Sequence, residues 1–125
     1  MKLYQVDASS LFLQEDSNNN KPCGVMFLST KRKALTTARA IAKEAKQFKS
    51  DCDKWRKSIS GKTDAEEMLD VYRAQPTHEW ASGNAGVVNV SLLTAKALPI
   101  RTLAETMLNG GDWIEEASSV WERNV

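Results

Sequence analysis

Cysteine and histidine are scarce in this 125-residue sequence, which contains two cysteines, Cys23 and Cys52, and a single histidine, His78. Two cysteines 29 positions apart cannot build the disulfide framework of a small secreted domain. Together with one histidine, they match no spacing typical of zinc ligands. The sequence therefore predicts free thiols in a cytoplasmic protein, with no metal site and no cofactor.

Long apolar runs are also absent. A membrane-spanning helix needs roughly 20 consecutive apolar residues, and no segment of this chain approaches that length. Residues 1–7 lack the apolar core of a signal peptide, so we expect no membrane partner. Hydrophobic residues make up 42% of the chain and charged residues 26%, as in an ordinary globular protein. The length predicts a single domain over residues 1–125.

A complete nucleotide-binding motif is missing as well. Residues 60–63, Ser-Gly-Lys-Thr, match the end of a phosphate-binding P-loop. That loop also needs a glycine five positions before its Gly-Lys pair, where this chain has Arg56. We interpret Gly61 as the end of one helix and Thr63, with Glu66 three positions later, as the capping box of the next.

Two residues are candidates for chemistry. His78 could act as a general base, and Cys23, between Pro22 and Gly24, as an accessible nucleophile. Neither has an activating neighbour in the sequence, because on a strand Glu79 would point away from His78. A capping or surface histidine and an unreactive thiol account for both residues more simply.

The first thirty residues predict an antiparallel hairpin or meander. Apolar and polar residues alternate over residues 3–8, which indicates a strand with one buried face. Residues 11–15 predict a second strand and residues 24–29 a third. The Asp/Ser/Asn-rich segment 16–22 between them predicts a turn or an exposed loop.

A long, basic, amphipathic helix over residues 33–59 is the clearest feature, with Ser29 or Thr30 as its N-cap. At the usual rise per residue it is roughly 40 Å long, which is longer than one face of a small domain. We expect it to project, to break near residues 49–51, or to pack on another subunit. Its apolar positions recur every three or four residues: Ala34, Ala38, Ile41, Ala45, Phe48, Cys52, Trp55 and Ile59.

Four further elements follow the long helix. The sequence predicts an acidic helix that ends before Pro76, a strand at 88–92, and a helix opened by Pro99. Residues 78–80 are a candidate partner strand for 88–92. A last helix is predicted after Asp112, because Asp112 and Glu115 match a capping box and the apolar residues that follow have helical spacing: Trp113, Ala117, Val120 and Trp121.

These elements predict an α+β fold with the order β-β-β-α-α-β-α-α. We expect a small, mostly antiparallel sheet with the helices packed on one face, because each amphipathic element must bury its apolar side. The chain contains no internal repeat and no linker long enough to divide it into two domains.

Charge is distributed unevenly along the chain. Residues 31–62 carry eleven Lys/Arg against three Asp/Glu, a net charge of +8, and residues 63–125 carry four against ten, a net charge of −6. The two halves either neutralise each other within the fold or present surfaces to partners. The candidate interaction surface is a strip of cations on the long helix: Arg39, Lys43, Lys46, Lys54 and Lys57.

Three functional hypotheses follow. The leading one is a non-enzymatic binding or adaptor protein that acts through protein–protein contacts and forms a homo-oligomer through the long helix. A compact chain without motifs is also common among accessory proteins of phages and mobile elements, which is an association only. The second hypothesis is nucleic-acid binding by the basic helix 31–57. The third is a small-ligand binder or enzyme that uses His78 and Cys23.

Overall fold

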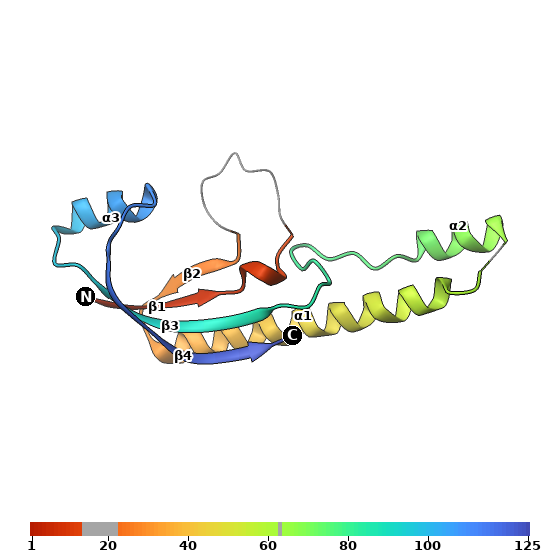
Figure 1. Ribbon diagram of the computed structural model, residues 1–125, viewed down its shortest axis with the longest axis horizontal. Coiled ribbons are helices and arrows are strands. Elements are labelled where there is room, and N and C mark those ends of the chain that lie inside the picture. The colour runs from red at the N-terminus through yellow and green to blue at the C-terminus, as the bar shows by residue number, and fades with distance from the viewer. Residues whose placement is uncertain (14–22, 63) are drawn as a thin grey trace.

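Four antiparallel strands form one sheet in the order β2-β1-β3-β4 (Figure 1). This computed structural model describes residues 1–13, 23–62 and 64–125. Strand β1 (Lys2–Asp7) lies between β2 (Val25–Leu28) and β3 (Val87–Ala95), and β4 (Ile114–Asn124) pairs with the other side of β3. The antiparallel sheet and its helices confirm the predicted α+β class.

The main core lies between one face of this sheet and helix α1 (Lys31–Ile59). Val6 of β1 pairs with Val90 of β3, and both side chains are fully buried under the helix. Facing them, α1 presents a row of small side chains: Ala34, Ala38, Ala42 and Ala45. Because alanine has only a Cβ, the helix backbone can approach the sheet closely.

Helix α1 ends at Ile59 as the sequence predicts, and it begins at Lys31, two residues before the predicted start. Thr30 is the N-cap, and its Oγ1 accepts a hydrogen bond of 3.2 Å from the backbone N–H of Lys33. Gly61 follows the helix with a φ of +79°, a left-handed conformation that favours glycine. Within the described part of the chain no helix could cross a membrane, because α1, with 29 residues, is too polar and the other helices are too short.

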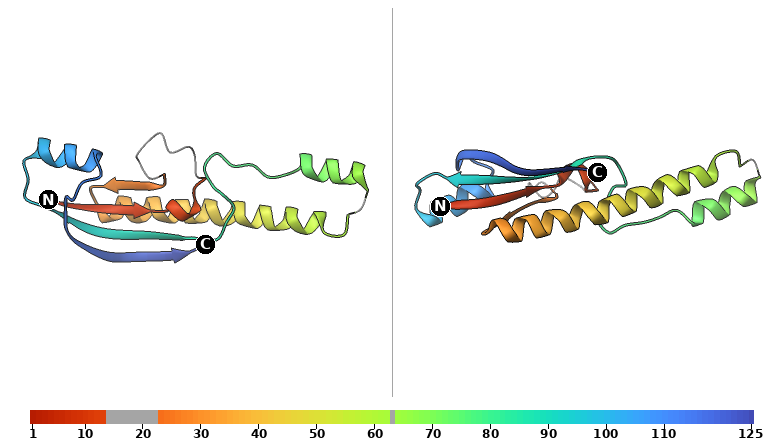
Figure 2. Two further views of the ribbon diagram at one scale, coloured as in Figure 1. Left: turned by 45° about the horizontal axis from the view of Figure 1, so that its top comes forward. Right: turned by 90° about the horizontal axis from the view of Figure 1, so that it is seen from below.

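The second half of α1 extends past the sheet. The buried cluster beneath the sheet ends at Ala45, and α1 continues without a break through residues 49–51 to Ile59. Helix α2 (Ala65–Arg73) runs back beside this extension, and both Figure 1 and Figure 2 show the pair protruding from one end of the molecule. The structure therefore shows projection and no break in the helix, and packing on another subunit stays a prediction.

Helix α3 (Ile100–Leu108) packs on the opposite face of the sheet from α1. Its Leu103 is buried with Leu93 and Trp113. Side chains alternate along a strand, so Leu93 faces away from the α1 side that Val90 occupies. The helices therefore cover both faces, whereas the sequence predicted one face only.

The last element is a strand, and the predicted helix after Asp112 is wrong. Strand β4 contains two β-bulges, which leave Glu115 and Val120 without a directly opposite partner in β3. Each bulge shifts the alternation by one residue, so the strand's period of two is hidden and the apolar spacing resembles that of a helix. Asp112 does not cap a helix; its Oδ2 lies 2.7 Å from Lys96 Nζ.

Two smaller predictions near the N-terminus and His78 also change. Within the described part of the predicted second strand, Leu11 ends a short 3-10 helix (Ser9–Leu11) and Phe12 makes an isolated bridge with Ala81. Residues 14 and 15 of that prediction lie outside the described residues. Residues 78–80 form a bend rather than a strand, because the backbone N–H groups that follow His78 bond to its side chain. The predicted loop at 16–22 lies outside the described residues.

The close contact between α1 and the sheet makes a testable prediction. Ala38 is fully buried and Ala40 is exposed on the same helix. We expect Ala38→Leu to lower the free energy of unfolding by about 1–3 kcal/mol, because the extra atoms overpack the core. The matched change Ala40→Leu should leave it within about 0.5 kcal/mol. Urea denaturation measures both, and equal effects would contradict the close packing.

Candidate functional site

The extension of α1 and helix α2 together form a projecting arm, defined here as residues 49–62 and 64–73. One side-chain hydrogen bond joins the two helices, in which Trp55 Nε1 donates to the backbone carbonyl of Val71 at 2.7 Å. An ion pair of 3.5 Å between Lys62 and Glu67 adds a second link. The start of α2 is capped by Asp64, which accepts from the N–H of Glu66 at 2.8 Å; the predicted cap, Thr63, lies outside the described residues.

Helix α2 has an apolar stripe that faces solvent. None of its residues is buried, and Met68, Leu69 and Tyr72 are 42%, 52% and 68% exposed. These positions, with Ala65, follow the i, i+3, i+4, i+7 spacing that places side chains on one side of a helix. Such a stripe normally packs against a core or a partner, and here the described part of the chain provides no cover for it.

The two helices of the arm carry opposite charge. The α1 part, residues 49–62, has five Lys/Arg and two Asp/Glu, a net charge of +3. The α2 part, residues 64–73, has four Asp/Glu and one arginine, a net charge of −3. The arm as a whole is therefore neutral, so two arms can approach each other without net repulsion.

The structure separates the predicted basic strip into two groups. Arg39, Lys43 and Lys46 line a hollow beside the sheet, where Arg123 of β4 joins them. Lys54 and Lys57 are exposed further along α1, on the arm. Among the described residues, none of these cations forms an ion pair.

The basic and acidic halves of the chain make little direct electrostatic contact. Two links between them occur among the described residues: the ion pair from Lys62 to Glu67, and the contact of 3.0 Å between His78 Nε2 and Glu44 Oε1. The strip of cations on α1 is thus largely uncompensated by carboxylates within residues 1–13, 23–62 and 64–125.

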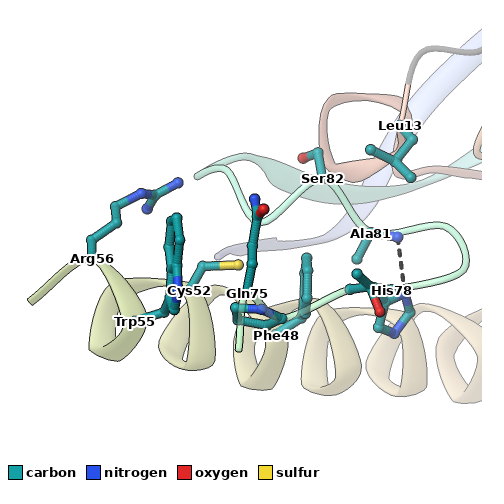
Figure 3. Close-up of a pocket in the computed structure, with 11 residues that line it drawn as sticks. Leu13, Phe48, Cys52, Trp55, Arg56, Gln75, His78, Ala81 and Ser82 are labelled. Atoms are coloured by element: carbon teal, nitrogen blue, oxygen red, sulfur yellow. Dashed lines mark hydrogen bonds between the residues drawn. The ribbon is translucent and has the colours of Figure 1, made fainter. Parts of the chain in front are cut away.

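His78 lies at the base of the arm, in a pocket with a volume of about 280 Å³. Figure 3 shows that Phe48, Cys52 and Trp55 of α1 form one wall of this pocket. His78 belongs to the segment that follows α2, residues 75–78, which also lines the pocket. Its Nδ1 accepts hydrogen bonds from the backbone N–H groups of Trp80 and Ala81, at 3.1 and 3.0 Å. An Nδ1 that accepts these bonds carries no proton, so the proton is on Nε2, which donates to Glu44.

This arrangement favours a structural role for His78. Both ring nitrogens already have partners, and the ring holds a bend of the chain closed against α1. Cys23, the other candidate for chemistry, is exposed and lines a different hollow with Phe12, Glu79 and Trp80. The structure does not bring the two candidates into one pocket.

Three features of these surfaces are not predicted from the sequence: two residues, and the exposure of one helix face. Glu44 contacts His78 across 34 positions, and Arg123 joins the cations of α1 from a segment predicted to be helical. Neither has a local sequence signal. The third is the stripe of α2, whose spacing indicates an amphipathic helix but cannot show that the stripe faces solvent.

No group of three or more His, Cys, Asp or Glu side chains with metal-binding geometry occurs within residues 1–13, 23–62 and 64–125. Comparisons with protein-family models, curated proteins and solved structures find no match to this chain. Evidence for a function therefore comes from the surfaces of the molecule.

The bonds of His78 make a second testable prediction. We expect His78→Ala to lower the free energy of unfolding by about 1–3 kcal/mol, because two backbone N–H groups lose their acceptor. Glu44→Gln should cost less than about 0.5 kcal/mol, since Glu44 is 57% exposed and the amide retains a hydrogen-bonding oxygen. Urea denaturation distinguishes the two. Equal losses would show that the backbone bonds are not the main contribution of His78.

Proposed function

We propose that this chain is a non-enzymatic binding or adaptor protein that acts through protein–protein contacts, and that its arm pairs with the arm of a second copy. The observation that carries the proposal is the exposed apolar stripe of α2, with Met68, Leu69 and Tyr72 between 42% and 68% exposed. A contiguous apolar surface on a projecting element is typical of an interaction site.

A second copy of the chain is a suitable occupant of this surface. In a two-fold symmetric dimer each surface meets the same surface of the partner. The exposed stripe of one α2 would then cover the stripe of the other. The arm carries a net charge of +3 on its α1 part and −3 on its α2 part, so two whole arms meet without net repulsion.

The short length of α2 also supports a partner. Isolated helices below roughly 12–15 residues are marginal in water, and α2 has nine residues, none of them buried. Contact with a second arm would bury its stripe and stabilise the helix.

We further propose a cytoplasmic location, supported by the two free cysteines, of which Cys23 is exposed.

Light scattering coupled to size exclusion tests the dimer. We expect the protein at micromolar concentration to have twice the mass of one chain. The double substitution Leu69→Asp/Tyr72→Ser should produce a monomer, because a buried charge without a partner prevents the stripes from packing. Both side chains are more than half exposed, so the fold of the monomer should be unchanged by circular dichroism.

The matched control is Ile100→Asp/Leu108→Ser on α3, which makes the same change in net charge. These two residues are apolar and 82% and 63% exposed, but they lie away from the arm. The control variant should remain a dimer. A monomeric wild-type protein, or an equal loss of dimer in both variants, would overturn the proposal.

A further inference from the structure

A cationic hollow lies between the middle of α1 and the end of β4. It has a volume of about 370 Å³, and Arg39, Lys43, Lys46 and Arg123 contribute four positive charges to its lining. Ala42 is the apolar residue of α1 in the same lining. The hollow is separate from the arm and from the pocket beside His78.

Helix geometry and sheet geometry together place these cations. Arg39, Lys43 and Lys46 have the i, i+4, i+7 spacing that puts three side chains on one side of a helix. Arg123 comes from β4, whose pairing sets it opposite Val88, a residue buried on the α1 side of the sheet. Two backbone hydrogen bonds, of 2.8 and 3.1 Å, between Val125 and Gly86 hold this end of the chain in position.

An aromatic ring adjoins the cations. The guanidinium of Arg123 lies 5.0 Å from the centre of the Trp121 ring, as a cation–π contact. Trp121 is only partly buried, and Arg123, which contacts its ring, is itself part of the lining of the hollow. Cations beside an aromatic plane form the arrangement by which proteins bind single-stranded nucleic acids, with phosphates on the cations and bases stacked on the plane.

We propose that this hollow binds the phosphate backbone of a single-stranded nucleic acid, and that Arg123 on Trp121 receives a neighbouring base. An acidic protein segment would satisfy the four charges but would make no use of the planar pair. The inference does not depend on dimer formation through the arm, because none of the residues involved belongs to it.

Fluorescence anisotropy of a labelled 12-nucleotide oligothymidylate tests binding directly. Each phosphate neutralised on a single strand contributes about −0.7 to the slope of log K against log salt concentration. Three to four phosphates in the hollow therefore predict a slope of about −2 to −3. Absence of binding at low salt would overturn the proposal.

A pair of charge-reversal variants localises the site. Arg39→Glu/Lys43→Glu should weaken oligonucleotide binding by about tenfold or more, because two phosphate contacts become repulsive. The control Lys31→Glu/Lys33→Glu makes the same change in net charge on the same helix, at exposed positions outside the hollow. Lys31 and Lys33 lie about 12 and 9 Å along the helix from Arg39, close to the Debye length of about 10 Å at 0.1 M salt, so screening weakens their effect on the hollow. Equal loss in both variants would contradict a site in the hollow.

Two more measurements identify the ligand of the hollow and test its independence from the arm. Poly-glutamate should fail to displace the oligonucleotide at equal charge concentration; displacement would favour an acidic protein partner and overturn the proposal. The variant Leu69→Asp/Tyr72→Ser should retain oligonucleotide binding within about threefold, since its changes are on the arm. A larger loss would contradict a binding surface confined to the hollow.

Discussion

The contact between the alanine row of α1 and the buried valines of the sheet determines how the rest of the molecule is arranged. Ala34, Ala38, Ala42 and Ala45 lie over Val6, Val88 and Val90, and all seven residues are at most 3% exposed. A helix held this closely has a fixed direction along the sheet. Because the row ends at Ala45, the larger apolar residues beyond it, such as Phe48 and Trp55, must find other partners.

Those partners are supplied by the segment that returns from the tip of the arm. Trp55 bonds to the carbonyl of Val71, and His78 bonds to Glu44 of α1 while holding its own bend closed. The returning chain covers one side of the extension, but it leaves the stripe of α2 exposed to solvent. The exposed stripe therefore lies on a part of the molecule that projects because α1 is longer than the sheet it packs on.

The sequence predicted the elements whose signals are local. The regular spacing of apolar residues from Ala34 to Ile59 required a helix, and Thr30 and Gly61 marked its limits. The prediction for β4 is wrong because two bulges break its alternation and Glu115 imitates a capping residue. The opposite-face position of α3 depends on Leu93 and Trp113, which come together only in the folded chain.

The candidate surfaces, too, could be predicted from the sequence only where their residues are close together along the chain. The spacing of Arg39, Lys43 and Lys46 places them on one side of a helix, but Arg123 joins them only because β4 is a strand that pairs with β3. The stripe of α2 can be recognised as amphipathic, but an apolar stripe looks the same in sequence whether it meets its own core or a second molecule.

We propose that the projecting arm is stabilised by a second copy of the chain. Amide hydrogen exchange of α2, Ala65–Arg73, measured across a dilution series, tests this most directly. We expect these amides to be protected at high protein concentration and to lose protection on dilution, while amides of β1 and β3 exchange equally slowly throughout. Exchange of α2 that is independent of concentration would contradict stabilisation of the arm by a second copy.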